Sequence, residues 1–304
     1  MISKTAKLHI DRKEEIQCYL MIGVPLIGFL IFTLYPILWA VRLSVYSYTG
    51  IPSETRMIGF LNYKKLFVDA AYWRSWVMTL EFAAIKILIE YTLGFIIANM
   101  LTGNRKGANV FRSMYYMPAI VSVAIVGLIF SNLFEYFGPI NVLLKKVGVI
   151  SQNVDWFSSK STALIALVTG SVWSSLGTTV MYFMAALATV PKELYESADI
   201  EGAGVFTRFF KITLPMIAPM LQILLMLSII SMLGANEYIL VMTNGAPAGT
   251  THTVMSYITS RVVPGFSVVA NIGYSSAMSV ITSIIVATIS ILYNVMSNKM
   301  KNIY

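Results

Sequence analysis

Six long apolar segments dominate this chain of 304 residues and restrict what it can fold into. A transmembrane α-helix needs about 20 mainly apolar residues, and each segment reaches that length. The segments run over Ile16–Val45, Trp76–Leu101, Met114–Phe134, Ala163–Val190, Met216–Met242 and Asn271–Met296. The alternating pattern of barrel strands is absent from the sequence. The sequence therefore predicts an all-α polytopic membrane protein with six transmembrane helices.

The composition supports this fold class. Hydrophobic residues make up 57% of the chain and charged residues 12%, whereas an average soluble domain has roughly 25% charged residues. These values argue against a soluble enzyme, a disordered chain and a coiled coil. The net charge of +8 comes mostly from basic residues beside apolar segments, so we interpret it as membrane-flanking charge. The single Cys18 and the two histidines argue against a disulfide framework and against a metal site.

Charge also predicts the topology. Six spans place both termini on one side, with tails at 1–15 and 297–304 around a transmembrane domain at 16–296. The segments on the side of the termini hold more than half of the 22 basic residues, which favours a cytoplasmic location for both termini. They are Lys4, Lys7, Arg12, Lys13, Arg105, Lys106, Arg112, Lys192, Arg208, Lys211, Lys299 and Lys301. The first segment lacks a clear small-residue cleavage site, so we expect a retained helix there.

The inner loop between the fourth and fifth spans, residues 191–215, is patterned more strongly than a connector requires. Pro191 suits a first helical turn, and acidic residues follow in the early turns, where the helix dipole favours them. Gly202 and Gly204 should end that helix, and a second short helix should follow until Pro215. The pattern predicts an acidic helix, a glycine turn and an aromatic helix. Apolar side chains facing the cytoplasm need either a partner or the underside of this protein's own helices.

The same loop carries a family resemblance. Glu196-Ser197-Ala198, followed by Gly202-Ala203 and by Leu214-Pro215, resembles the EAA loop of permease subunits in binding-protein-dependent ABC importers. Ser197 replaces the usual central alanine of that motif. Further segments resemble the carbohydrate-uptake branch, which includes the maltose and glycerol-phosphate importer permeases. These segments are Arg112 with Tyr116-Met117-Pro118, Gly138-Pro139-Ile140-Asn141, Thr243-Asn244-Gly245-Ala246-Pro247 and Gly273-Tyr274-Ser275-Ser276-Ala277.

The resemblance implies a type I ABC importer permease in a bacterial plasma (inner) membrane. In that family the loop is a coupling helix that docks on a cytoplasmic ATPase. Glu196 would then face a basic group of the ATPase, and Gly202 would form the turn. The aromatic half of the loop would tie it to the membrane helices. The implied coupling residues are Glu196, Ser197, Ala198, Gly202, Ala203, Phe206, Phe209, Leu214 and Pro215.

The energy source must lie on another chain. A P-loop needs the pattern G-x-x-x-x-G-K-[ST], and the nearest candidates, residues 103–107 and 158–161, lack the required glycines and spacing. We therefore expect no catalytic residue and no cofactor on this chain, with ATP and magnesium on a dimeric partner ATPase. The resemblance also implies a second, homologous permease and an extracytoplasmic solute-binding protein.

Polar residues within the spans predict a solute path, because such residues usually face a bundle interior or a water-filled route. In the fourth span, Ser171, Ser174, Ser175, Thr178 and Tyr182 recur at three- and four-residue steps and share one face. The alternative is close helix packing, which small hydroxyl residues also allow. The remaining candidates are Trp173 beside this stripe, Ser228 and Ser231 in the fifth span, and Asn236 and Glu237 beyond them.

Three charged residues of the second span leave two interpretations open. Lys86 and Glu90 are four residues apart and can pair on one helix face, and Glu81 lies five residues before Lys86. A structural pair or a contact with the sister permease competes with a proton relay. The relay, with Glu237, would suit an ion-coupled secondary transporter, which we consider a weaker alternative because no internal repeat is visible. An importer of a non-sugar solute is the other alternative, whereas the H-E-x-x-H motif of an intramembrane metalloprotease is absent.

Overall fold

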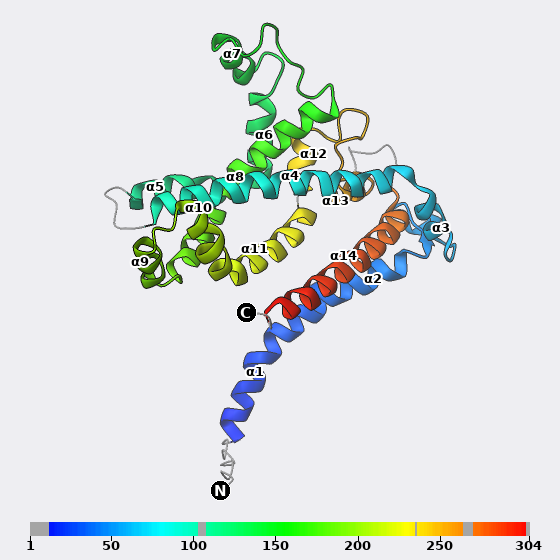
Figure 1. The fold of residues 1–304 in the computed structure, drawn as a ribbon. Coiled ribbons are helices and arrows are strands. Elements are labelled where there is room, and N and C mark those ends of the chain that lie inside the picture. Colours follow the sequence, from blue (N-terminus) through cyan, green and yellow to red (C-terminus); the bar gives the residue numbers. More distant parts are fainter. Residues whose placement is uncertain (1–11, 103–107, 235, 264–269, 302–304) are drawn as a thin grey trace. The chain divides into compact units, whose positions relative to one another are not determined.

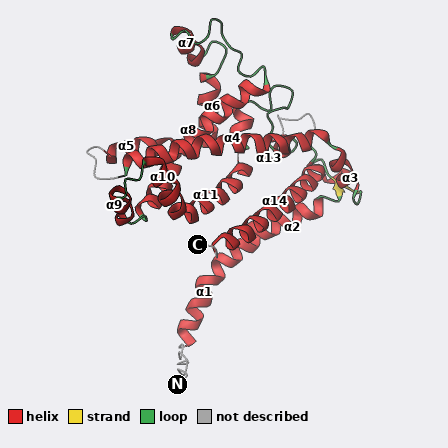
Figure 2. Ribbon diagram, in the orientation of Figure 1, coloured by secondary structure: helices red, strands yellow, loops and turns green. Residues whose placement is uncertain are grey.

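The computed structural model describes residues 12–102, 108–234, 236–263 and 270–301. Nearly all of the regular structure is helical, with one short pair of strands (Figure 2). The all-α prediction is therefore confirmed. The chain divides into two compact units, residues 1–67 with 271–281 and residues 68–270 with 282–304, and each is described by itself.

The first unit contains the N-terminal helices and a small hairpin. Its elements are α1 (Arg12–Phe29), a π-helical segment (Leu30–Leu34), α2 (Tyr35–Leu43), β1 (Tyr46–Ser47), a 3₁₀ turn (Pro52–Glu54), β2 (Arg56–Met57), α3 (Leu61–Val68) and the first turns of α14 (Ile272–Lys301). The strands pair antiparallel, with Tyr46 opposite Met57. Buried Asn62 fixes the entry to β1, because its side-chain amide donates to the carbonyls of Ser44 (2.9 Å) and Tyr46 (3.0 Å).

The second unit holds the remaining helices (Figure 1). They are α4 (Ala70–Leu101), α5 (Ala108–Tyr116), a 3₁₀ turn (Met117–Ile120), α6 (Val123–Leu133), α7 (Pro139–Lys146), α8 (Lys160–Ala188), α9 (Lys192–Ile200), α10 (Val205–Arg208), a π-helical segment (Phe209–Thr213), α11 (Leu214–Gly234), α12 (Glu237–Met242), α13 (Val254–Ser260) and the rest of α14. Side-chain caps start α4 and α8. Asp69 directly precedes α4, and its side chain accepts hydrogen bonds from the amides of Ala71 and Tyr72. Ser159 directly precedes α8, and its side chain accepts a hydrogen bond from the amide of Thr162.

Helix α8 is central to the second unit because it contributes to both of its apolar clusters. One cluster joins α8 to α4, α6 and α12 through side chains such as Phe82, Phe130 and Ile239. The other joins α8 to α4 and α11 through Phe183 and Ile217, among others. The pair α4 and α8 runs side by side over much of its length (Figure 1). This packing places the serines of the polar stripe of α8 between α4 and α11.

Glycines allow this close packing. A Cβ atom built on Gly177 of α8 would overlap the carbonyl oxygen of Tyr115, and one built on Gly94 of α4 would lie 2.9 Å from the Thr179 side chain. Small residues at helix contacts let membrane helices approach closely. The local sequence thus sets the spacing between α8 and the helices beside it.

The number of spans differs from the sequence prediction. Among the described residues, four helices are long and apolar enough to cross a membrane: Ile16–Leu43, Lys160–Ala188, Val205–Ser231 and Ile272–Ser297. The pair Val110–Ile120 and Val123–Leu133 would make a fifth span. Helix α4, which contains the predicted span Trp76–Leu101, is a continuous helix of 32 residues but lies outside this set. With the bent pair counted as one span, the predicted span that is missing from this set is therefore the one in α4.

The third predicted span is not a straight helix. Its two halves meet at 96° between Ile120 and Val123. Pro118 is the second residue of the 3₁₀ turn, and Val121 and Ser122 have extended-type ψ angles of 135° and 137°. Proline removes a backbone donor, so the helical ladder ends here and restarts at α6. The prediction of one helix over Met114–Phe134 was wrong on this point.

Pro215 does not close the second loop helix, contrary to prediction. The chain runs from Val205 to Ser231 as one candidate span, and Pro215 lies in the first turn of α11. The π-helical segment before it provides the reason. The amide of Leu214 donates to the carbonyl of Phe209, which widens the helix just before the residue that lacks an N–H. The loop is therefore joined to the fifth span without a break.

The ends of the chain show a smaller difference. Residues 12–15, predicted as tail, belong to α1, and α14 extends to Lys301. Residues 1–11 and 302–304 lie outside the described residues, as do Arg105 and Lys106 of the topology argument and the weak P-loop candidate at 103–107. Between Ile16 and Leu43 the apolar window is 0% buried. Its side chains are thus available to lipid or to another subunit.

Candidate coupling loop and solute cavity

The loop at 191–215 folds as the predicted helix, glycine turn and helix. Helix α9 ends in the turn that glycine permits, with Gly202 at φ +71°. The amide of Gly202 donates to the carbonyl of Asp199 (3.1 Å), and that of Ala203 donates to Ala198 (2.8 Å). This pair of bonds is the Schellman arrangement, in which the residue with positive φ is usually glycine. Gly202 therefore sets the direction in which α10 leaves α9.

Side-chain contacts brace the two halves of the loop against each other. Arg208 of α10 pairs with Asp199 of α9, and the Tyr195 hydroxyl lies 2.9 Å from the Thr213 hydroxyl. Ala198 is buried under the turn. Sequence reasoning missed both polar contacts, although the acid and the arginine flank the glycine turn in the sequence. The loop is a braced element that continues directly into α11.

In the aromatic half, Phe209 and Ile212 pack against the membrane helices. The Phe209 ring packs edge-on against Phe95 of α4, with centroids 5.1 Å apart. The Phe210 ring meets Phe209 edge-on, with centroids 4.9 Å apart, but Phe210 is 61% exposed, and Phe206 is 80% exposed. The expectation that the aromatic half ties the loop to the membrane helices is thus wrong for Phe206. Its side chain lies on the open side of the turn.

The open side of the loop combines acidic and apolar side chains. Glu196 and Ser197 are exposed on α9, beside Ile200 at 89% and Val205 at 73% exposure. The other motif residues lie deeper or at the start of α11: Ala203 and Leu214 are half-buried, and Pro215 is exposed. The loop therefore presents a mixed surface that can receive both an ionic and an apolar contact.

A second feature is a cavity of about 170 Å³ between α4, α8 and α11. Polar side chains of three helices line it, together with Tyr238 of α12. These polar side chains are Lys86, Ser171, Ser174, Ser175, Ser228 and Ser231. The structure thus brings the serines of the fourth span together with those of the fifth, as the path prediction requires.

The other predicted path residues do not line this cavity. Thr178 and Tyr182 continue the α8 stripe by one and two turns beyond it. Trp173 is 41% exposed and packs on Phe130 at 5.5 Å. The Asn236 amide donates to the Thr259 hydroxyl at 3.1 Å, and Glu237 is exposed at the start of α12. Geometry within this chain therefore supports only the serine part of the predicted path.

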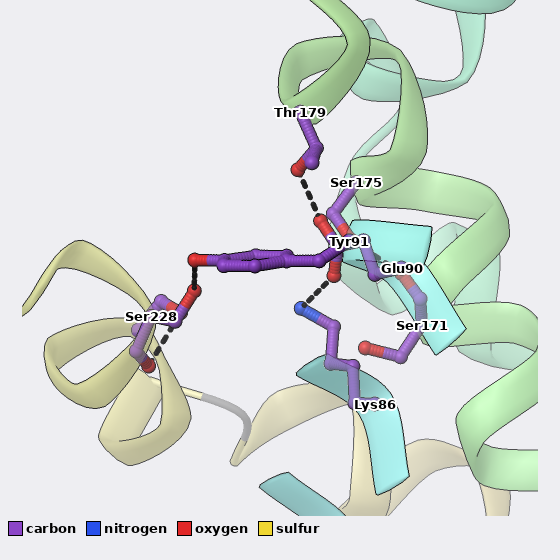
Figure 3. A network of polar contacts seen from close by, with 8 residues as sticks. Lys86, Glu90, Tyr91, Ser171, Ser175, Thr179 and Ser228 are labelled. Carbon is purple, nitrogen blue, oxygen red and sulfur yellow. Dashed lines mark hydrogen bonds and ion pairs between the residues drawn. The ribbon is translucent and has the colours of Figure 1, made fainter. Parts of the chain in front are cut away.

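A polar network joins α4 to α8 and α11 (Figure 3), and two of its members, Lys86 and Ser228, also line the cavity. Lys86 lies 3.1 Å from Glu90, which confirms the expected pair. Glu90 is 5% exposed and also accepts a hydrogen bond from Thr179. The next residue, Tyr91, places its hydroxyl 2.7 Å from that of Ser228. Sequence reasoning missed Thr179 and Tyr91, because only packing shows which faces of α8 and α11 meet α4.

The partners of these charges fit a structural role. Lys86 and Glu90, whose side chains are 18% and 7% exposed, neutralise each other, and a lone buried charge at either position would be costly. Glu81 pairs at 2.5 Å with Lys160 at the start of α8, and both side chains are 40% exposed. Within the described residues, no group of three or more His, Cys, Asp or Glu side chains is placed to hold a metal ion.

Comparisons with known proteins agree with this architecture. The chain is 32% identical over 285 residues to the probable ABC transporter permease protein YesP of Bacillus subtilis, covering 92% of this chain and 90% of the relative. It is 29% identical over 276 residues to the trehalose/maltose transport system permease protein MalF of Thermococcus litoralis, covering 90% and 91%. A chain of a bacterial ABC transporter involved in the import of the acidic polysaccharide alginate has the same fold, with a TM-score of 0.79, 23% identity and coverage of 94% and 96%.

The family assignment rests on most of the chain. Residues 90–302, which include the buried Glu90, the cavity serines of α8 and α11 and the whole loop at 191–215, match the family described as "Binding-protein-dependent transport system inner membrane component". Members of this family are permease subunits, and hydrolysis of ATP is not a reaction of the permease itself. The chain belongs to the family of inner membrane components of binding-protein-dependent transport systems.

Proposed function

We propose that this chain is a permease subunit of an ATP-driven importer for a carbohydrate, and that the serine-lined cavity is part of the solute path. The observation that carries the proposal is the convergence of three serines of α8 with two of α11 on one cavity. Serine hydroxyls donate and accept hydrogen bonds, as sugar hydroxyls do. The printed names of relatives, among them permeases for trehalose/maltose and for lactose, support a carbohydrate solute.

The second part of the proposal concerns the loop at 191–215, which docks on a separate ATPase. The exposed Ile200, Val205 and Phe206 supply the apolar contact, and Glu196 supplies an ionic contact to a basic group of the ATPase. The brace between Asp199 and Arg208 keeps the turn rigid. Because α10 continues into α11, a displacement of the docked loop moves the helix that carries Ser228 and Ser231. ATP and magnesium belong to the ATPase.

The proposed importer function also implies an assembly of several subunits. A second, homologous permease covers the open side of the cavity, and an extracytoplasmic binding protein delivers the solute. The chain lies in a bacterial plasma (inner) membrane, with residues 1–15, 297–304 and the loop at 191–215 in the cytoplasm. The apolar window at 16–43, which is unburied within this chain, lies against lipid or the second permease.

Co-purification tests this proposal most simply. A tagged chain isolated in mild detergent should bring down an ATPase and a second permease, and a cysteine placed at Glu196 should cross-link to the ATPase. A cysteine at Lys145 on α7, which lies outside the loop, is the matched control and should not cross-link. Isolation of the chain alone, with solute flux that needs no ATP, would contradict the proposal and favour ion coupling through Lys86 and Glu90.

A further inference from the structure

A second pocket in the chain is lined by two arginines, which are absent from the lining of the serine cavity. It has a volume of about 440 Å³ and lies between the first turns of α4 and the segment from Ala248 to Arg261. This volume lies within the range of small-molecule sites. Its polar lining consists of Arg74, Thr250, His252, Tyr257, Ser260 and Arg261.

The two arginines are available to a ligand. Arg74 is exposed, and no hydrogen bond or ion pair engages it among the described residues. Arg261 donates one hydrogen bond, from Nη2 to the Tyr257 hydroxyl at 2.9 Å, and its guanidinium lies 5.0 Å from the Tyr257 ring centre. A guanidinium has five N–H donors, so most of the donors on this pair are unused. The pocket therefore presents two positively charged guanidinium groups whose N–H donors can bind a ligand.

The position of Arg261 is fixed by a chain of contacts. The Tyr257 hydroxyl that accepts from Arg261 also donates to Asp69 Oδ2 at 3.2 Å, and Asp69 caps α4. The His252 ring packs edge-on against Tyr257 at 6.0 Å, and its Nδ1 lies 3.2 Å from the Ser256 hydroxyl. Tyr257 thus fixes Arg261 beside the pocket, and Asp69 and His252 in turn fix Tyr257. This order in the unbound protein lowers the entropy lost when a ligand binds.

We infer that this pocket binds a carboxylate group on the transported solute, such as that of a uronic acid. Arginine pairs with a carboxylate through two parallel hydrogen bonds. The two arginines and the adjacent Asp69 carry a combined charge of +1, which matches a singly charged carboxylate better than a doubly charged phosphate. The hydroxyls of Thr250 and Ser260 donate to the carbonyls of Pro247 and Tyr257, each at 2.8 Å, so their lone pairs remain to accept hydrogen bonds from the rest of the sugar. The inference rests on the proposed function, because it assigns the class of solute.

Binding of a simple probe tests the inference. Isothermal titration of the chain in nanodiscs would compare a methyl hexuronide, the corresponding neutral methyl hexoside and a hexose 6-phosphate. We expect the hexuronide to bind tightest, and Arg74→Gln to weaken it about tenfold, the effect of one lost charged hydrogen bond. Arg74→Lys should restore only part of the binding, because lysine lacks the fork. Lys145→Gln, which removes a positive charge outside the pocket, is the control.

Several outcomes would overturn the inference. Equal binding of charged and neutral probes, or hexuronide binding that Arg74→Gln and Arg261→Gln leave unchanged, would show that the pocket does not recognise a carboxylate of the solute. Loss of binding-protein docking in these variants, without hexuronide binding to the unaltered chain, would assign the arginines to that protein's carboxylates instead. None of these results depends on recovery of an ATPase, so failure of the inference and failure of the proposed function remain distinguishable.

Discussion

The Tyr91 hydroxyl of α4 and the Ser228 hydroxyl of α11 lie 2.7 Å apart, in the polar network that also contains the Lys86–Glu90 pair. This hydrogen bond links the helix that holds the buried charges to the helix that continues from the loop at 191–215. A displacement of α11 relative to α4 must therefore stretch or break it. Movement of the loop at 191–215 can therefore change this contact and the position of Ser228 in the cavity lining.

Tyr91→Phe tests that link. The variant removes one partly buried hydrogen bond, so we expect a loss of about 1 kcal/mol in stability and slower solute uptake. Thermal unfolding in detergent and uptake in proteoliposomes would measure the two effects. Tyr182→Phe is the matched control, because Tyr182 is 39% exposed and forms no hydrogen bond among the described residues. Equal behaviour of the two variants would contradict a role for the contact.

The Lys86–Glu90 pair allows a double-mutant test. Lys86→Met alone leaves Glu90 buried without its cation, and we expect a loss of roughly 3 kcal/mol. Lys86→Met with Glu90→Gln removes both charges and should recover most of that loss. Glu81→Gln, in a pair whose side chains are 40% exposed, should cost less than about 1 kcal/mol.

The readout that separates structure from ion coupling is transport. A structural pair predicts that the double variant still takes up solute with ATP and without an ion gradient. Loss of all uptake in a double variant that unfolds at the normal temperature would contradict the structural interpretation.

Gly177→Ala tests the packing of α8. A Cβ atom at this position would overlap the backbone of Tyr115, so the helices must move apart, and overpacking of this kind typically costs about 1–3 kcal/mol. We expect a lower melting temperature in detergent. Gly204→Ala is the control, because nothing lies within 4 Å of its Cβ position. A Gly177→Ala protein as stable as the unaltered chain would disprove this packing.

His252 predicts a pH effect in the segment after α12. Burial, and then the charge of Arg261, lowers the pKa of His252 below its usual value. Unfolded histidine takes up a proton near pH 6.5, whereas the folded protein resists protonation until a lower pH. The stabilising contribution is therefore fully present above about pH 6.5 and is lost as the pH falls towards the folded pKa.

The groups facing His252 are Arg261, Arg74, Tyr257 and Ser256. Between pH 7 and pH 5, the melting temperature of the unaltered protein should fall more steeply than that of His252→Gln. Parallel curves for the two proteins would contradict the assignment.

Much of this architecture was predictable from local sequence. Apolar length located the helices that hold the predicted spans, and the spacing of Lys86 and Glu90 predicted their pair, because both signals depend on helix periodicity alone. Gly202 predicted the loop turn, since few other residues adopt its φ of +71°. The serines of α8 and α11 were predicted as candidates, although not their meeting in one cavity.

Other features depend on tertiary contacts and gave no such signal. Pro118 was visible in the sequence, but the 96° bend beside it depends on how α6 packs against α12 and α8. Pro215 suggested a helix end, whereas a π-helical segment lets the helix pass through it. Thr179 and Tyr91 became functional candidates only when the facing helix surfaces were known. The pocket of Arg74 and Arg261 joins residues that are far apart in the sequence.

The central claim is that the loop transmits ATP hydrolysis on a partner to solute movement through this chain, and Gly202→Thr tests it most directly. A β-branched residue at φ +71° is strained, whereas Thr at Gly204 is a favourable N-cap in open space. In proteoliposomes with the co-purified subunits, we predict that Gly202→Thr inserts normally but loses ATP-driven uptake, while Gly204→Thr retains it. Equal uptake by the two variants, or uptake by the chain alone without ATP, would contradict the account.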